Sequence, residues 1–146
     1  MFVEFEVPGK PPKKDGANSM WRKDSEAQNI INLRKEARKA VEKIGVDLFS
    51  GPLGIELTIY ARINEIEGMG DLDNFITGVC DGLQRAHPNV MRYINERILK
   101  ECNPHQSIFV VDDAKVYDIR ARKVPFDGEM YYWLKVFEID SRSHHE

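Results

Sequence analysis

Alternating apolar and polar residues predict four β-strands in this chain. The alternation covers residues 2–8, 53–63, 115–124 and 130–139. Successive side chains of a strand point to opposite faces, so a period of two is typical of a sheet with one buried face. The turn residues 125–128 separate the last two strands. We therefore predict that those two strands pair as a hairpin.

A different spacing, with apolar residues three or four positions apart, predicts helices between the strands. The longest covers about residues 24–44, and Gly45 suits the left-handed position that follows many helix ends. A second helix opens at Asn74 and stops before Pro88, which cannot continue it. A third helix is expected over residues 89–102.

These elements follow one another in the order β-α-β-α-(α)-β-β, which is typical of an α+β fold. We predict a two-layer sandwich, in which a mixed four-stranded sheet has its helices on one face. The chain has 146 residues, enough for one domain with a substantial core. We expect that domain over residues 1–140 and a tail at 141–146.

Composition and charge limit the classes of function that we expect for this protein. No apolar run approaches the roughly 18 residues that cross a bilayer, and the first residues lack a signal-peptide pattern. Cys80 and Cys102 fit no zinc or redox spacing, so we expect a cytoplasmic protein with no membrane contact. The net charge is −3, yet residues 10–44 hold ten basic and five acidic side chains, a local excess of +5. Such a patch can bind phosphates, and a solvated helix face is the other interpretation.

Two acidic segments carry the candidate chemistry. Gly70-Asp71-Leu72-Asp73-Asn74 opens the second helix, and Asp112-Asp113 opens the third strand. Asp71 and Asp73 are two residues apart, so on an extended approach both carboxylates point to the same side. Oxygen ligands of this kind suit Mg²⁺, which takes one or two carboxylates together with waters and phosphate oxygens. Helix capping is the other interpretation of these aspartates.

Three motifs follow one another along the chain. They are Asp71-Leu72-Asp73-Asn74-Phe75, then Asp81-Gly82-Leu83, then Val111-Asp112-Asp113-Ala114-Lys115-Val116 at the start of a basic strand. Together with Pro11-Pro12 and the basic loop after the first strand, they resemble the RusA family of Holliday-junction resolvases. The resemblance covers most of residues 2–139 and departs at about 85–109, where this chain carries a longer insertion.

The resemblance implies a homodimeric, Mg²⁺-dependent endodeoxyribonuclease that resolves branched DNA by paired symmetric cuts in recombination and repair. Mn²⁺ is the expected substitute for Mg²⁺. By position in the motifs, the catalytic and metal-binding carboxylates would be Asp71, Asp73 and Asp113, with Asp112 as a neighbouring metal ligand.

One position departs from the family pattern. The resemblance places a catalytic lysine four residues after Asp73, where this chain has Thr77. A threonine can contact DNA phosphates but cannot neutralise negative charge. Lys115 is the expected catalytic replacement because it shares one side of a strand with Asp113, although a solvent-facing lysine is the other interpretation. The remaining expected DNA contacts are basic residues near the N-terminus: Lys10, Lys13, Lys14, Arg22 and Lys23.

Two other functions remain open at this point. Because Thr77 replaces the expected lysine, the second candidate is a non-catalytic or weakly active branched-DNA-binding protein of the same fold. A remote third candidate is a transferase that uses Asp-x-Asp to hold a nucleotide-sugar diphosphate. The sequence shows no phosphate-binding loop that would favour it.

Overall fold

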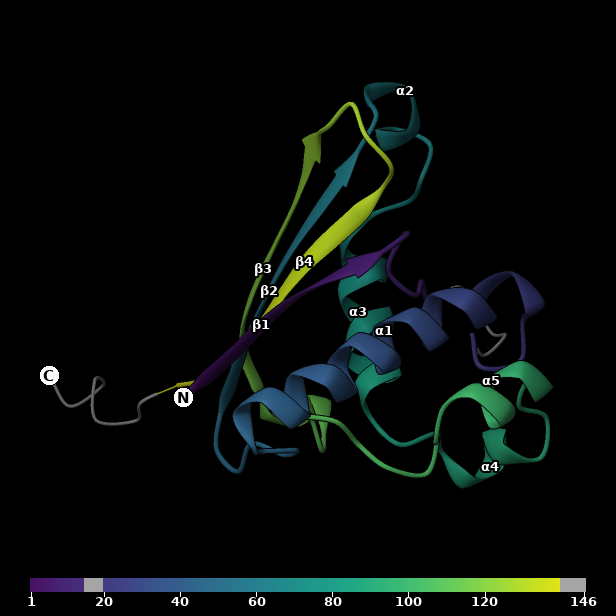
Figure 1. Cartoon of the computed structure of the whole chain (residues 1–146), viewed down its shortest axis with the longest axis vertical. Helices are drawn as coiled ribbons and strands as arrows, with labels where there is room; N and C mark the ends of the chain where they lie inside the picture. Colours follow the sequence, from purple (N-terminus) through teal and green to yellow (C-terminus); the bar gives the residue numbers. More distant parts are fainter. Residues whose placement is uncertain (15–19, 140–146) are drawn as a thin grey trace, which may run out of the picture.

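The computed structural model describes residues 1–14 and 20–139. The tail expected at 141–146 and part of the basic loop, residues 15–19, lie outside the described residues. Four strands form one mixed sheet in the order β1-β4-β2-β3 (Figure 1). The strands are β1 (Phe2–Pro8), β2 (Leu53–Ala61), β3 (Val116–Pro125) and β4 (Tyr131–Glu138).

The predicted hairpin of the last two strands is wrong, because β2 lies between them. β2 pairs parallel with β3 and antiparallel with β4, so Leu57 has Ala121 on one side and Leu134 on the other. The long apolar strand β2 is buried best in the middle of the sheet, where both of its edges are hydrogen-bonded. The connection from β3 to β4 crosses the end of β2, where the Phe126 amide donates to the Ala61 carbonyl at 2.8 Å.

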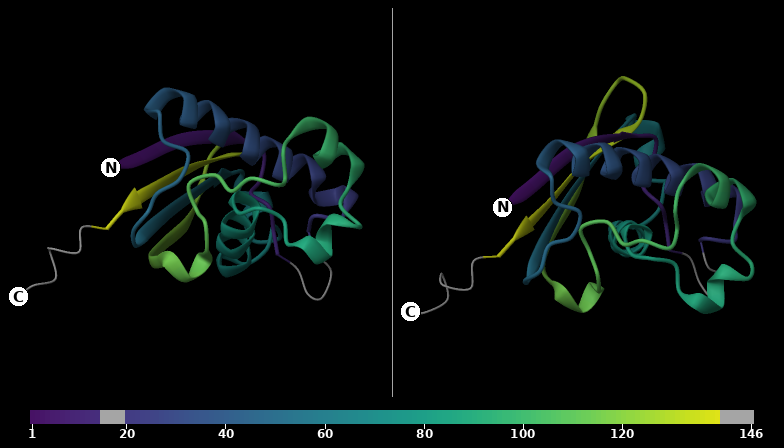
Figure 2. Two further views of the ribbon diagram at one scale, coloured as in Figure 1. Left: turned by 90° about the horizontal axis from the view of Figure 1, so that it is seen from below. Right: turned by 60° about the horizontal axis from the view of Figure 1, so that its bottom comes forward.

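Two helices cover one face of this sheet, as the α+β prediction requires. Figure 2 shows α1 (Asp24–Ile44) and α3 (Leu72–Leu83) lying side by side on that face. Both helices contribute to one core with the inward side chains of all four strands. Gly45 has the predicted left-handed conformation, with φ of 75°, and its amide donates to the Val41 carbonyl. No helix of residues 1–14 and 20–139 is long and apolar enough to cross a membrane.

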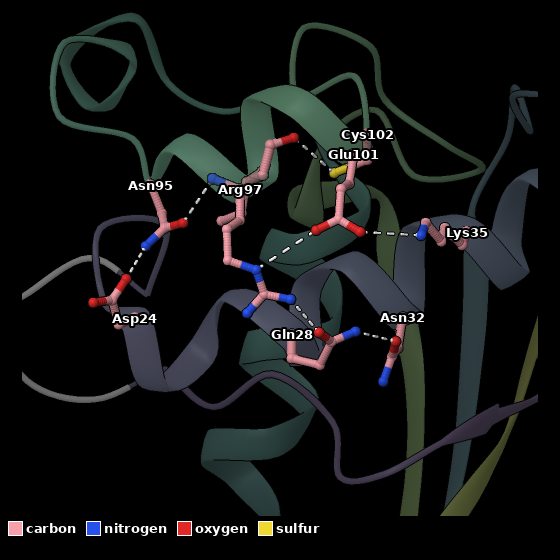
Figure 3. A network of polar contacts seen from close by, with 9 residues as sticks. Asp24, Gln28, Asn32, Lys35, Asn95, Arg97, Glu101 and Cys102 are labelled. Carbon is pink, nitrogen blue, oxygen red and sulfur yellow. Dashed lines mark hydrogen bonds and ion pairs between the residues drawn. The ribbon is translucent and has the colours of Figure 1, made fainter.

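The third predicted helix is divided into two short ones, α4 (Pro88–Met91) and α5 (Glu96–Glu101). Asn95 causes the break, because its side chain accepts from the Arg97 amide and caps α5 while its own amide donates to the Trp21 carbonyl. Figure 3 shows the polar contacts that join α5 to α1. A further short helix that the pattern did not indicate, α2 (Ile63–Ile66), begins at the last residue of the second predicted strand, because β2 ends at Ala61.

The insertion at 85–109 packs against the domain instead of standing apart. Its short helices share a second hydrophobic cluster with the first half of α1 and with the residues just before it. The buried members of this cluster are Met20, Trp21, Ala27, Ile30, Ile31, Ala86, Ile94 and Ile98. The first half of α1 therefore packs mainly against the insertion, and its second half packs against the sheet.

A buried arginine joins α1, the end of α3 and the insertion. Arg34 is 1% exposed, and its guanidinium donates to the Gly82 carbonyl at 2.8 Å and the Asn103 carbonyl at 2.6 Å. It also donates to the carbonyls of Gln84 and Gln106. Two of these four acceptors belong to the last turn of α3 and the residue after it, where helix carbonyls lack partners and a cation is favoured. One side chain thus satisfies backbone groups from two segments that are distant in the sequence.

We predict that Arg34→Lys lowers the free energy of unfolding by about 3 kcal/mol, because one ammonium cannot reach four separated carbonyls that stay buried. Arg38→Lys is the matched control one turn along α1, where a single exposed hydrogen bond joins the side chain to Gln106. Urea unfolding of both variants measures the difference. Equal stability of the two variants would show that the Arg34 contacts contribute little.

Candidate active site

The first acidic segment lies at the start of α3, and this helix begins two residues earlier than predicted. The helix begins at Leu72, and Asp71 is its N-cap residue with extended backbone, φ −85° and ψ 145°. Asp73 is therefore inside the first turn instead of on an extended approach to Asn74. Carboxylates near a helix start interact favourably with its dipole, which favours this earlier beginning. Both carboxylates are exposed. Asp71 has an extended backbone and Asp73 a helical one, so the two side chains do not share one side of a strand as predicted.

The second acidic segment forms a turn and not the start of a strand. Asp112 caps a short 3₁₀ helix, η1 (Asp113–Lys115), through its carboxylate, which accepts from the Ala114 amide at 2.9 Å. This side-chain contact competes with strand pairing, so β3 begins only at Val116. The expectation that Asp113 and Lys115 share one side of a strand is therefore wrong. Both side chains are exposed on the turn.

A strained residue precedes this turn. Phe109 has a φ of 63°, a conformation that non-glycine residues rarely adopt, and the Val110 amide donates to the Ile108 carbonyl across it at 2.7 Å. Its ring is fully buried and stacks on Phe49 with ring centroids 5.4 Å apart. Packing of the ring holds the strained backbone in place. The chain that carries Asp112 is thereby fixed to the core three residues before the turn.

The second acidic segment lies near the second half of α3. Burial, with the carboxylates of Asp81 and Asp113, raises the pKa of the Cys80 thiol to about 12. Asp113 therefore lies within electrostatic reach of the second half of α3, while Cys80 is about 10 Å along the helix from Asp73 at 1.5 Å per residue. Across residues 1–14 and 20–139, no group of three or more His, Cys, Asp or Glu side chains is placed to hold one metal ion.

The metal site expected from the carboxylates of Asp71, Asp73, Asp112 and Asp113 therefore stays a prediction. The donors fit Mg²⁺ chemically, because Asp71 and Asp73 offer carboxylate oxygens and this ion binds one or two carboxylates with waters and phosphates. Asp113 lies within electrostatic reach of Cys80, in the second half of the same helix.

The basic loop after β1 docks against α3. The carbonyl oxygen of Pro12 lies 1.9 Å from where a Cβ would stand on Gly78, so only a glycine permits this approach. The Lys14 amide donates to the Asn74 carbonyl at 3.2 Å, and its ammonium is 3.3 Å from the Asp81 carboxylate. Two residues of the predicted DNA-binding set, Lys13 and Lys14, are thereby held beside the acidic helix.

Lys13 stands next to the residue that precedes Asp71. Its Cε and Nζ atoms lie 3.0 Å from where a Cβ would stand on Gly70, whose φ of 125° also favours glycine. Within the described ranges its ammonium has no ion pair or hydrogen bond. The ammonium of Lys123, from β3, donates to the Gly70 carbonyl at 2.6 Å and to the Ile66 carbonyl at 3.1 Å. Two cations thus surround the approach to the first acidic segment.

The sequence analysis did not indicate this arrangement. Lys13 was expected to contact DNA, with no placement at the acidic motif. The glycines at positions 70 and 78 were the available signal, because each allows a close approach by another segment.

The other predicted DNA contacts lie in different surroundings. The Thr77 hydroxyl donates to the Asp73 carbonyl at 2.9 Å, a bond within α3. The Arg22 guanidinium stacks over Tyr93 of the insertion, 5.0 Å from the ring centroid. Lys23 is the N-cap residue of α1, and Lys10 is half-buried after β1. Arg22 therefore contacts the insertion, and not α3.

We predict that Gly78→Ala destabilises the protein by about 2 kcal/mol, although alanine normally favours a helix, because its methyl group would collide with the Pro12 carbonyl. The Lys14 amide should then exchange faster with solvent, since its bond to Asn74 would be broken. Gly68→Ala is the control, because nothing lies within 4 Å of its added methyl group. Thermal unfolding and amide hydrogen exchange measure both effects, and an unchanged Lys14 amide would contradict the docking.

Neither the comparison with protein-family models nor the comparison with curated proteins finds a match for this chain. The resemblance to RusA resolvases accordingly rests on the acidic motifs and the N-terminal basic loop alone. The function has to be argued from the site itself.

Proposed function

We propose that this chain is a Mg²⁺-dependent endodeoxyribonuclease that resolves Holliday junctions or related branched DNA by paired cuts, in the cytoplasm, during recombination or repair. The observation that carries the proposal is the docking of the basic loop on α3. It brings Lys13, a cation without a partner in the described part of the chain, next to the Asp71 end of the acidic helix. Exposed carboxylates can hold the metal ion of phosphodiester cleavage, and an adjacent ammonium can neutralise charge on the phosphate.

The roles within the site follow from its charges. Asp71 and Asp73 would hold Mg²⁺, which when bound supplies an activated water and stabilises charge on the phosphate. Lys13 is placed to neutralise negative charge beside them, a role that Thr77 cannot fill because its hydroxyl is neutral and already donates to the Asp73 carbonyl. Lys123 fixes the Gly70 carbonyl and so orients the chain that enters the helix. Asp113 and Lys115 stay candidate catalytic residues on the neighbouring turn.

A branched-DNA-binding protein without nuclease activity is the second candidate. One observation favours it: Thr77 occupies the position of the expected lysine, and its hydroxyl donates to the Asp73 carbonyl. In this case the Lys10, Lys13 and Lys14 loop would bind phosphates, and the carboxylates would only cap α3 and η1.

Paired cuts require two active sites, and we place the dimer contact on the face of the sheet opposite α1 and α3. On that face Glu4, Lys135, Glu56 and Arg120 occupy neighbouring strands in one row of alternating charge. A two-fold axis along the strands would set Glu4 against Arg120 of a second copy and Lys135 against Glu56. Each pair has opposite charges, so the row is complementary to itself.

We predict that Asp73→Asn abolishes Mg²⁺-dependent cleavage of a synthetic four-way junction and leaves junction binding within about twofold, because the amide cannot supply an anionic metal ligand. Asp127→Asn, an exposed carboxylate in the connection between β3 and β4, is the control and should cut normally. Cleavage by Asp73→Asn would reject the proposed site. Binding by the unchanged protein with no cleavage in Mg²⁺ or Mn²⁺ would favour the second candidate, and cleavage gained by Thr77→Lys would support it further.

We predict a solution mass of about twice the 16.9 kDa of one chain, measured by light scattering after gel filtration. Glu56→Lys should shift the protein toward monomer, because two like charges would then face each other across the contact. Adding Lys135→Glu should restore the dimer. A monomeric unchanged protein would exclude this contact and leave the DNA-binding proposal untouched.

A further inference from the structure

A pocket of about 340 Å³ lies between α1 and the end of α5, away from the acidic site. One wall is a run of basic side chains from two successive turns of α1, namely Arg34, Lys35, Arg38 and Lys39. The opposite wall is the exit of the insertion, with Glu101, Cys102 and Asn103. Figure 3 shows Lys35 facing Glu101 and Cys102 across the space between the two helices.

More positive than negative side chains line this pocket. Of the described side chains that line it, Glu101 is the one carboxylate, against four cations. Glu101 is already shared, because its carboxylate is 3.3 Å from the Lys35 ammonium and 3.6 Å from the Arg97 guanidinium. Arg38 has a single hydrogen bond among the described residues, to the Gln106 side chain, and its other donors are available. Lys39 is also paired, because its ammonium is 3.1 Å from the Glu36 carboxylate. Four cations against these two carboxylates still leave a local excess of positive charge, and the uncommitted donors belong to Arg38.

The most deeply buried of these cations has no anionic partner. Arg34 is 1% exposed, and its guanidinium donates to backbone carbonyls and lies over the Trp21 ring, 5.8 Å from the centroid, with no carboxylate in an ion pair within the described chain. Its Nε is buried without a hydrogen-bond partner there. Burial lowers the pKa of the Arg34 guanidinium to about 10, which reflects the cost of the uncompensated charge. A bound anion in the adjacent pocket would offset part of that cost.

We propose that this pocket binds a phosphate group. A phosphate carries up to two negative charges and several acceptor oxygens, and it suits the planar fork of Arg38 flanked by the ammonium groups of Lys35 and Lys39. The volume lies at the low end of ligand pockets, so it admits a small phosphate compound or one phosphate of a nucleic-acid backbone. The pocket lies between α1 and the insertion, and none of its lining residues belongs to the acidic site, so the proposal stands whether or not the chain is a nuclease.

Titration of the full chain with inorganic phosphate, and separately with pyrophosphate, tests the proposal by calorimetry and amide chemical shifts at constant ionic strength. We expect saturable binding, with shifts at residues 34–39 and 101–103. Lys35→Gln with Arg38→Gln should weaken it at least tenfold. Lys43→Gln, an exposed cation on the last turn of α1 outside the pocket, is the matched control and should bind as the unchanged protein does. Lack of saturation, or equal weakening in the control, would overturn the proposal.

A gain of affinity gives an independent test. Glu101→Gln removes the carboxylate that competes for Lys35, so phosphate should bind several-fold more tightly. A short DNA duplex then distinguishes the sources of the phosphate. Binding of free phosphate that DNA does not displace indicates a small phosphate compound. Weaker DNA binding by the double variant, with a smaller salt dependence, indicates a backbone phosphate. If Glu101→Gln changes neither phosphate nor DNA binding, the pocket is not the site.

Discussion

The burial of one guanidinium is the constraint on which the arrangement of this molecule depends. Arg34 projects from the middle of α1 and satisfies carbonyls from the end of α3 and from the chain that leaves α5. Buried carbonyls without a donor are costly, so these segments can only close around the guanidinium together. The same contact fixes the far end of α3, and with it the direction of the helix whose other end carries Asp71. One side chain thus contributes to the placement of both the insertion and the helix of the acidic site.

Local patterns predicted the elements better than their pairing. The stripe of α1 and its Gly45 terminator were readable because each depends on neighbours within one or two turns. The hairpin was not, because the partner of β4 is decided by how β2 is buried, and β2 lies far earlier in the chain, as the pair Leu57 and Leu134 shows. The 3₁₀ turn at Asp113 was missed because of a local contact. A single side-chain bond from Asp112 outweighed the strand propensity of the residues after it.

The acidic motif, too, could be predicted from the sequence only in part. Its position at a helix start could be read from the sequence, since Asp71 and Asp73 precede an apolar helical stripe. The cation beside it could not, because Lys13 reaches it through a steric fit between the Pro12 carbonyl and Gly78. Such a fit has no local signature beyond the glycine. The insertion likewise looked like an addition to the domain, yet Trp21 and Ile98 share a core. Its second role emerges only from the four cations that it encloses with α1.

Phe109 fixes the direction of the chain between the core and the second acidic segment. Its left-handed backbone is held by the stacking of its ring on Phe49 and by two backbone hydrogen bonds, in which its amide donates to the Asp47 carbonyl and the Phe49 amide donates to its carbonyl. Val110, the next residue, is fully buried. A change of the Phe109 torsion would break both bonds and displace Val110 from the core. The turn that carries Asp112 and Asp113 therefore inherits its position from uncharged groups three residues earlier.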